Sequence, residues 1–156
     1  MTRGSPALAF LLVLALSAGC RSSAPAGDLA PAPLELEITA GARLNPNDQG
    51  QPLPTVIRIY QLRSTGKLER AEFDRLYRQP KELLQEDLVQ AEEVTLSAGE
   101  TLKRRVERDR GARYVAVVAL FRRPTGTSWR AVAELGSPAQ RAELKFMVEG
   151  YRIERQ

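Results

Sequence analysis

The chain has 156 residues, 43% hydrophobic and 27% charged, which suits one compact domain with short extensions. It contains no histidine and a single cysteine, so metal sites built from several His or Cys side chains, a Ser-His-Asp triad and a Cys-His dyad are excluded. The formal net charge is only +4, and basic residues stand beside acidic ones without a long block of one sign. This mixture predicts a solvated surface and no nucleic-acid partner.

The first segment of the chain has the pattern of an export signal. Arg3 precedes the apolar run 7–16, and the small residues Ser17, Ala18 and Gly19 follow it. The apolar run is about half the ~20 residues that a membrane-spanning helix requires, so it predicts a cleaved secretory signal over residues 1–19.

Cys20 is the candidate lipidation site. Small residues before a lone cysteine resemble the lipobox of bacterial lipoproteins, although Ser17 stands where the lipobox usually has Leu. The resemblance implies a covalent diacylglycerol and an N-acyl chain on Cys20, and each buried CH2 contributes about 0.8 kcal/mol to membrane binding. Lipoproteins retained at the inner membrane usually have Asp directly after the cysteine, whereas this chain has Arg21. The resemblance therefore implies a location on the periplasmic face of the outer membrane. The alternative is a chance cysteine near an ordinary cleavage site.

Residues 20–33 are predicted to be the lipidated cysteine and a flexible tether. From Arg21 to Pro33 the residues are mostly Ser, Ala, Pro and Gly, and Leu29 is the only large apolar side chain. Such a segment spans ~20 Å as a coil and about 40 Å when prolines keep it extended. The folded domain is therefore expected over residues 34–156.

Alternating and β-branched residues predict strands through most of that domain. Residues 34–38 alternate Leu or Ile with Glu, and residues 114–121 are apolar on both faces, as in a central strand. The other candidates are residues 56–62, 94–96, 101–106, 129–135 and 144–153, where Gly150 could break the last. Seven or eight short strands separated by Gly, Pro and Ser turns predict an all-β fold, a two-sheet antiparallel β-sandwich.

Residues 69–87 have a helical rather than an alternating pattern. Apolar side chains recur there at helical intervals, and Pro80 divides the segment into two short helices. Phe73, Leu76 and Tyr77 share one face, which we expect to cap an end of the sandwich. The alternative is a docking helix for a partner.

An ordered set of short motifs runs through residues 34–135. It consists of Asn-Pro-Asn-Asp-Gln-Gly-Gln-Pro-Leu-Pro from Asn45, the strand 56–62, Phe73 with Leu76, Asp87-Leu88, Glu93 before Leu96, Gly99-Glu100, Tyr114 ahead of Val117-Val118-Ala119, Phe121-Arg122 and Trp129-Arg130. With the lipobox and the two-helix insertion, this set resembles the TssJ (SciN, VasD) lipoprotein family of type VI secretion systems. Ala98 departs from the Pro that the family often has before Gly99.

The resemblance implies a transthyretin-like β-sandwich anchored in the outer membrane. It would bind the periplasmic C-terminal region of the inner-membrane protein TssM (IcmF-like) and, through it, TssL, with no catalytic residue, metal, cofactor or small-molecule substrate. In the family the loop between the first two strands contributes to partner contact. The corresponding candidate binding residues are Asn45, Pro46, Asn47, Asp48, Gln49, Gly50, Gln51, Pro52, Leu53 and Pro54.

The length and composition of loop 45–54 also favour binding. Hairpin connections usually have 2–5 residues, and longer loops tend to be functional or disordered. Pro46, Pro52 and Pro54 restrict the backbone, so less entropy is lost when the loop orders against a partner. The alternative is an ordinary surface crossover, in which Asn, Asp, Gly and Pro are equally expected.

Two other functions compete with protein binding. Tyr60, Phe121 and Trp129 could form an aromatic platform for a cell-wall glycan or small ligand, although aromatic residues in strands more often belong to the core. Glycoside hydrolysis needs only two carboxylates. Glu92 and Glu93, however, are expected on opposite faces of a strand, so we expect no enzyme.

Three arginines stand beside apolar residues in the predicted strands. Arg58, Arg122 and Arg130 could pair with Glu35, Glu37 or Glu134 across a sheet face, or form a basic patch for the partner. The sequence does not choose between these arrangements.

Overall fold

The computed structural model describes Met1 and residues 30–156, so the predicted signal peptide and Cys20 lie outside the described residues. Within the described part of the chain, no helix is long and apolar enough to cross a membrane.

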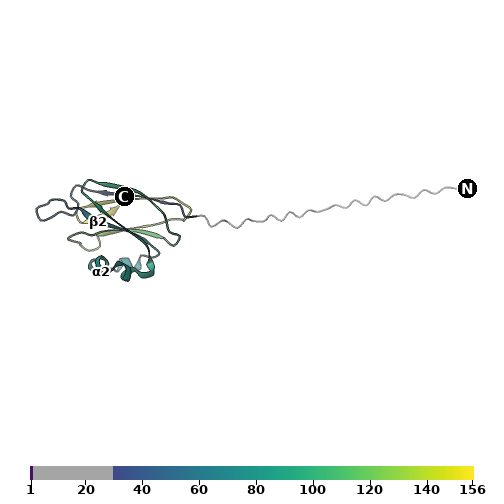
Figure 1. Cartoon of the computed structure of the whole chain (residues 1–156), viewed down its shortest axis with the longest axis horizontal. Helices are drawn as coiled ribbons and strands as arrows, with labels where there is room; N and C mark the ends of the chain where they lie inside the picture. Colours follow the sequence, from purple (N-terminus) through teal and green to yellow (C-terminus); the bar gives the residue numbers. More distant parts are fainter. Residues whose placement is uncertain (2–29) are drawn as a thin grey trace.

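Within residues 30–156, eight strands form two four-stranded sheets that pack as a sandwich, which confirms the predicted fold class (Figure 1). The first sheet has the order β4-β1-β7-β8 and the second the order β3-β2-β5-β6. The strands are β1 (Leu34–Ala40), β2 (Thr55–Leu62), β3 (Leu88–Leu96), β4 (Thr101–Val106), β5 (Tyr114–Ala119), β6 (Arg130–Glu134), β7 (Ala142–Glu149) and β8 (Arg152–Arg155). Five neighbouring pairs are antiparallel, whereas β1 and β7 run parallel.

The alternation in the sequence sets which side chains enter the core. Along β1, Leu34, Leu36, Ile38 and Ala40 are buried between the sheets, and the residues between them are half-buried. In contrast, β5 is buried on both faces from Val115 to Ala119, as its continuous apolar sequence predicts.

Of two strand boundaries, one agrees with the sequence expectation and one differs from it. Gly150 has φ +58° and separates β7 from β8, so the predicted run 144–153 does break there. β3 begins at Leu88 and is much longer than the predicted 94–96. The sequence pattern missed its first part because Gln90, Glu92 and Glu93 interrupt the alternation of a half-buried strand.

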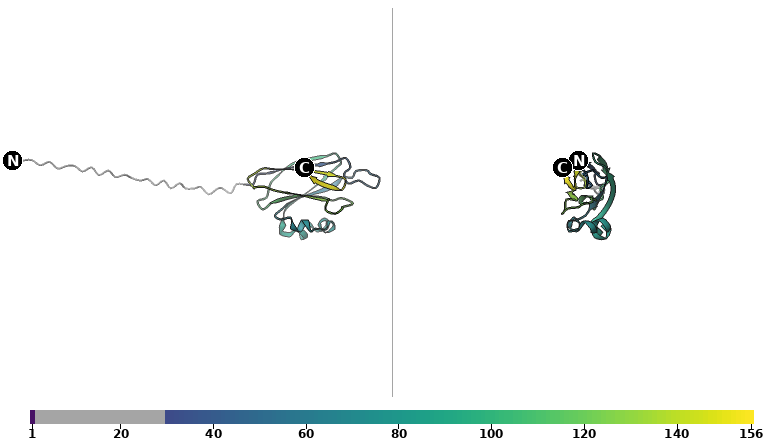
Figure 2. Two further views of the ribbon diagram at one scale, coloured as in Figure 1. Left: turned by 180° about the vertical axis from the view of Figure 1, so that it is seen from behind. Right: turned by 90° about the vertical axis from the view of Figure 1, so that its left-hand side faces the viewer.

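The helices form a third layer on the outer face of the second sheet (Figure 2). They are α1 (Gly66–Glu69), α2 (Phe73–Arg78), α3 (Pro80–Leu84) and the 3-10 turn η1 (Gln85–Asp87). Pro80 divides α2 from α3 as predicted, but the expectation that these helices cap an end of the sandwich is wrong. Leu68, Leu76 and Leu84 are buried under the layer, whereas Tyr77 is 48% exposed.

Two arginines from the second sheet hold this helical layer. Arg58 donates from Nη1 to the carbonyl of Tyr77 at 3.0 Å, and Arg130 donates to the carbonyls of Ala71 and Glu69 at 3.0 and 2.6 Å. The last carbonyls of a helix have no partner within the helix. The guanidinium groups satisfy such carbonyls of Glu69 in α1 and Tyr77 in α2, and their positive charge is favourable at a helix C-terminus.

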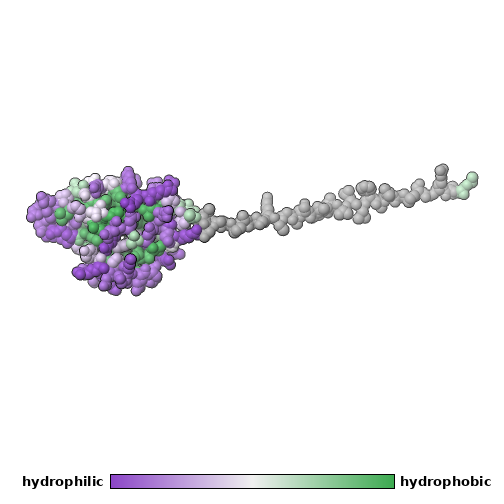
Figure 3. Space-filling view, in the orientation of Figure 1, coloured by the Kyte–Doolittle hydropathy of each residue, from purple (hydrophilic) through white to green (hydrophobic). Residues whose placement is uncertain are grey.

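The described chain enters the sandwich at one end and its longest loop lies at the other. Near the entry, the amide of Ala32 donates to the carbonyl of Pro138 at 2.8 Å. β1 then runs the length of the sandwich, and the β1–β2 connection projects from the opposite end (Figure 2). The loop end and the helical layer are hydrophilic on the surface, and apolar residues show between them (Figure 3).

Candidate functional site: the distal loops

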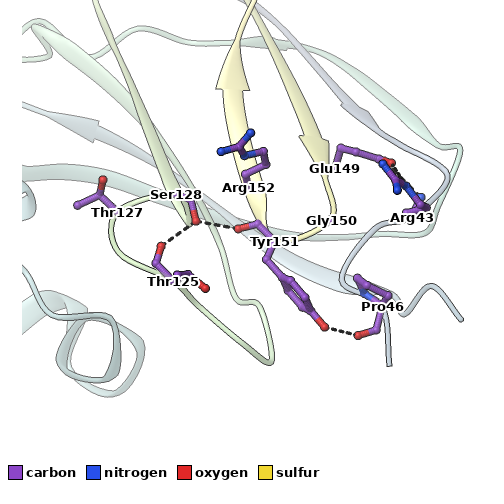
Figure 4. Close-up of a pocket in the computed structure, with 9 residues that line it drawn as sticks. All are labelled: Arg43, Pro46, Thr125, Thr127, Ser128, Glu149, Gly150, Tyr151 and Arg152. Carbon is purple, nitrogen blue, oxygen red and sulfur yellow. Dashed lines mark hydrogen bonds and ion pairs between the residues drawn. The ribbon is translucent and has the colours of Figure 1, made fainter. Parts of the chain in front are cut away.

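Three connections meet at the end of the sandwich opposite the chain entry, and we call them the distal loops. They are loop 41–54 between β1 and β2, connection 120–129 between β5 and β6, and turn 150–151 between β7 and β8. They surround a hollow of about 670 Å³ (Figure 4). Its lining consists of Arg43, Pro46, Thr125, Thr127, Ser128, Glu149, Gly150, Tyr151 and Arg152.

The base of loop 45–54 is fixed to the sandwich by two adjacent residues. Leu44 is fully buried, and its carbonyl accepts a hydrogen bond from the amide of Leu53 at 3.0 Å. Asn45 is 5% exposed and has φ 45°, a left-handed conformation that Asn tolerates better than most residues. Its amide donates to the carbonyl of Gly150 at 2.7 Å, so the loop is held against the β7–β8 turn.

The tip of the loop is organised by Asn47. Its Oδ1 accepts hydrogen bonds from the amides of Gln49 and Gln51, both at 2.9 Å, and its Nδ2 donates to Oε1 of Gln51 at 3.0 Å. The amide of Gly50, at φ +78°, donates to the carbonyl of Asn47 at 3.0 Å. A side chain that bonds the backbone two residues ahead forms an Asx-turn, so the tip has a defined conformation.

Asp48 joins the loop to the β5–β6 connection. Its carboxylate accepts hydrogen bonds from Arg122 at 2.8 and 3.4 Å and from Arg123 at 2.6 Å. The hydrogen bond from Arg122, together with the positive charges of both arginines, lowers the pKa of Asp48 below its usual value. The amide of Arg122 also donates to Oδ1 of Asn45 at 3.0 Å, so each loop holds the other in place.

Tyr151 connects the third distal loop to the first. Its hydroxyl donates to the carbonyl of Pro46 (Figure 4). Its ring lies edge-on to Phe121 with centroids 6.0 Å apart. On the same rim, Arg43 and Glu149 form an ion pair at 3.1 Å. Backbone and side chain therefore cross-link all three connections.

The ten predicted binding residues stay together in this one loop but differ in exposure. Asn45 is buried and structural, Pro46, Asn47 and Leu53 are half-buried, and the exposed members are Asp48, Gln49, Gly50, Gln51, Pro52 and Pro54. The sequence analysis missed Leu44, Arg123 and Tyr151, which position the loop. An apolar Leu directly before Asn-Pro was the only local signal for Leu44.

The competing interpretations of the aromatic residues and the carboxylate pair lose support here. Tyr60, Phe121 and Trp129 are 1%, 3% and 2% exposed, so they belong to the core and form no open platform. Glu92 and Glu93 bond to different partners, Arg104 and Arg58 respectively. In the part of the chain that the structure describes, no three His, Cys, Asp or Glu side chains gather as a metal site.

The predicted partners of the three arginines are also different from those observed. Arg58 pairs with Glu93 at 2.8 Å, Arg122 pairs with Asp48, and Arg130 bonds to the carbonyls of Glu69 and Ala71. They lie on the helix-covered face and at the distal end, so they form no single basic patch. Two of the glutamates pair across the first sheet instead, Glu37 with Lys103 at 3.5 Å and Glu35 with Arg105 at 4.0 Å.

The fold and the site define a β-sandwich protein with a rigid, polar loop surface at one end. The family model T6SS-SciN, described as type VI secretion lipoprotein (VasD, EvfM, TssJ, VC_A0113), matches residues 32–150. The chain belongs to this family, as the sequence motifs predicted. It is a family of secretion-system lipoproteins and not an enzyme family.

Solved structures support the same assignment. The T6SS lipoprotein TssJ1 from Pseudomonas aeruginosa is 25% identical with a TM-score of 0.74, and the match covers 81% of this chain and 95% of that chain. Serratia marcescens Lip, described as a membrane-bound component of the Type VI Secretion System, shares the fold at 23% identity and a TM-score of 0.71, covering 81% and 98%. No curated protein sequence matches the chain.

Two further matches come from structures whose descriptions name an assembly or another protein. A chain in a structure described as a Type VI membrane complex is 26% identical with a TM-score of 0.73, covering 81% of this chain and 98% of that chain. A chain in a structure described as the T6SS protein TssM C-terminal domain from EAEC is 25% identical with a TM-score of 0.70, covering 80% and 97%.

Proposed function

We propose that this chain is the outer-membrane lipoprotein of a type VI secretion membrane complex and that it anchors the periplasmic C-terminal region of TssM. The family membership supports the secretion role, and the two structures described as a membrane complex and as the TssM C-terminal domain support the choice of partner. TssL joins the complex through TssM.

The observation that carries the proposal is the rigid loop 45–54 at the end of the sandwich opposite the chain entry (Figure 2). β1 separates the two ends, and its 7 residues span ~23 Å at about 3.3 Å per residue. A lipid on Cys20 would hold the entry end towards the membrane through the tether 20–33. The exposed residues of the loop would then face away from the membrane, towards a protein that rises from the inner membrane.

The hydrogen bonds within the distal loops support a binding role for loop 45–54. A loop that is ordered before it meets a partner loses less conformational entropy on binding. The carboxylate of Asp48 and the amide side chains of Gln49 and Gln51 are exposed on this ordered frame. We therefore assign partner contact to the exposed residues and a positioning role to Asn45 and Pro46.

A shortened loop tests this assignment. In the full chain, residues 47–51 are replaced by a Gly-Gly link, which removes the tip but keeps Leu44, Asn45 and the base hydrogen bond to Leu53. Co-purification with the TssM periplasmic region should be lost, while circular dichroism and thermal unfolding still report a folded sandwich. A matched control is Glu37→Ala on the outer face of the first sheet, which should bind normally. Retained binding by the shortened loop would refute the assignment.

The membrane assignment is tested separately at residues 20 and 21. Mass spectrometry of the native protein should find diacylglycerol and an N-acyl chain on Cys20, and Cys20→Ser should release the protein from the membrane fraction. Arg21→Asp should move it to the inner membrane. Unchanged fractionation of the Arg21→Asp variant would contradict the sorting part of the proposal.

A further inference from the structure

β3 is an open edge of the second sheet. Edge strands in natural proteins are usually protected by short length, by charged side chains, especially lysine, or by cover from other elements. β4 carries Lys103, Arg104 and Arg105 in succession, and β8 has 4 residues of which three are charged. β3 has 9 residues, the longest strand described, and contains no lysine or arginine. Its charged residues are Glu92 and Glu93 near the middle, so the uncharged first four residues, 88–91, leave a backbone edge available to pair with an added strand.

Two hollows lie along the first half of β3. One of about 180 Å³ lies between the strand and α3, with Tyr60, Lys81, Leu88 and Ala91 in its lining. A second, of about 530 Å³, shares Lys81, Leu88 and Ala91 with the first. The free edge of the strand is thus bordered by two neighbouring hollows.

The smaller hollow contains a buried donor without an acceptor. Tyr60 is 1% exposed, and its hydroxyl oxygen has no hydrogen-bond partner among the described residues. Burial raises the pKa of this phenol and the neighbouring Arg58 guanidinium partly offsets that rise; because Arg58 can only donate, the hydroxyl proton still lacks an acceptor. Buried polar groups in folded proteins are almost always paired, so this hydroxyl indicates a ligand that supplies an acceptor.

One of the two cations beside the hollow is unpaired within residues 30–156 and could meet an anionic acceptor. Lys81 has no ion-pair partner in the described part of the chain, and Arg58 lines the same hollow. The two glutamates of the lining are already paired, Glu93 with Arg58 and Glu92 with Arg104. A carboxylate would meet the Tyr60 hydroxyl and the Lys81 ammonium together.

A second copy of this chain is a poor occupant of the edge. Antiparallel pairing of two β3 strands about their middle residue would place Glu92 opposite Glu92 of the other copy and Glu93 opposite Ala91. Like charges directly opposite each other destabilise a strand pair. The edge therefore suits a different protein.

We propose that the free edge of β3 binds an extended segment of a partner protein and that an acidic side chain of this segment enters the hollow at Tyr60 and Lys81. Main-chain hydrogen bonds would supply affinity, and the carboxylate pocket would supply specificity, as in other cases of strand addition. This surface is separate from the distal loops and does not rest on their assignment.

The test uses the full chain with two blocked peptides, acetyl-Thr-Val-Asp-Val-Thr-amide and its Asn counterpart, and with acetate. NMR titration should show that the Asp peptide shifts the amides of Lys81 and Ala91, that it protects β3 amides from exchange, and that it binds more tightly than the Asn peptide. Tyr60→Phe and Lys81→Ala should each weaken the affinity for the Asp peptide about tenfold, as expected for a lost hydrogen bond to a charged group. The control Lys145→Ala, on the outer face of the first sheet, should leave the affinity for the Asp peptide unchanged.

Three outcomes would overturn the proposal. Equal binding of the Asp and Asn peptides would exclude a carboxylate pocket. Strand addition would be excluded if acetate shifts the amides of Lys81 and Ala91 as much as the Asp peptide does and the peptide does not protect the β3 amides from exchange. If Tyr60→Phe lowers the thermal midpoint of the free protein and no probe binds, the hydroxyl is satisfied by bound water.

Discussion

Asp48 and Arg122 lie 74 residues apart in the sequence, yet the carboxylate of one accepts a hydrogen bond from Nη1 of the other at 2.8 Å. The pair is exposed, so it contributes little to the stability of the whole domain. Its effect is local, since it fixes the tip of the loop that we propose to bind TssM.

Asp48→Asn should therefore weaken co-purification with the TssM periplasmic region and leave the thermal midpoint unchanged. The charge that attracts Arg122 and Arg123 is lost, so the loop samples other conformations before binding. Amide exchange at Gln49 and Gly50 should become faster. Glu37→Gln, which breaks another exposed ion pair, is the matched control; the same loss of binding in both variants would contradict a specific role for Asp48.

The same contact sets a pH dependence. Because Arg122 and Arg123 lower the pKa of Asp48 below 3.8, the contact should be complete above 3.8 and lost only as the pH falls through the lower value of the folded state. A carboxyl-detected NMR titration measures this midpoint. Arg122→Gln should raise it towards 3.8, and an unchanged midpoint in that variant would show that Arg122 is not the main cause.

Leu44→Ala should destabilise the whole sandwich. The side chain is fully buried at the base of the loop, and removing a buried leucine side chain costs about 2–5 kcal/mol. Chemical denaturation measures the loss. Leu53→Ala, at a half-buried position of the same loop, should cost clearly less. Similar losses in both would mean that the loop base packs differently.

Arg130→Met should loosen the helical layer. The carbonyls of Glu69 and Ala71 would lose their donor, at a cost of about 1–3 kcal/mol, although methionine retains much of the packing. The guanidinium also lies 4.5 Å from the ring of Trp129, so tryptophan fluorescence should report the change. Arg130→Lys should recover only part of the stability because an ammonium cannot reproduce the planar fork. Unaltered exchange of α1 amides in Arg130→Met would rule this role out.

Most of the fold could be predicted because local patterns determine it. The alternation in β1, the continuous apolar run of β5 and the division of the helices at Pro80 each follow from neighbouring residues. The parallel pairing of β1 with β7 and the position of the helical layer depend on contacts between distant residues. Arg130 reaches a carbonyl 59 residues away, which no local pattern reveals.

The candidate site was predictable to a similar extent. Loop length and its prolines indicated residues 45–54, but the partners that hold the loop come from other connections. Tyr151 reaches Pro46 across 105 residues of sequence, and Arg123 reaches Asp48 across 75. The sequence could not assign these contacts because each requires the register of the two sheets.

The central position of β1 determines how the domain would respond to a pull on its N-terminal end. β1 lies between β4 and β7; the ladder with β7 runs along its whole length and the ladder with β4 stops one residue short. A force along the strand would load these hydrogen bonds together in shear, whereas an edge strand pulled from its end can peel away one bond at a time. Breaking many hydrogen bonds together raises the barrier to unfolding, and forced unfolding is governed by the rate of crossing this barrier. This arrangement therefore makes the first strand a mechanically durable attachment.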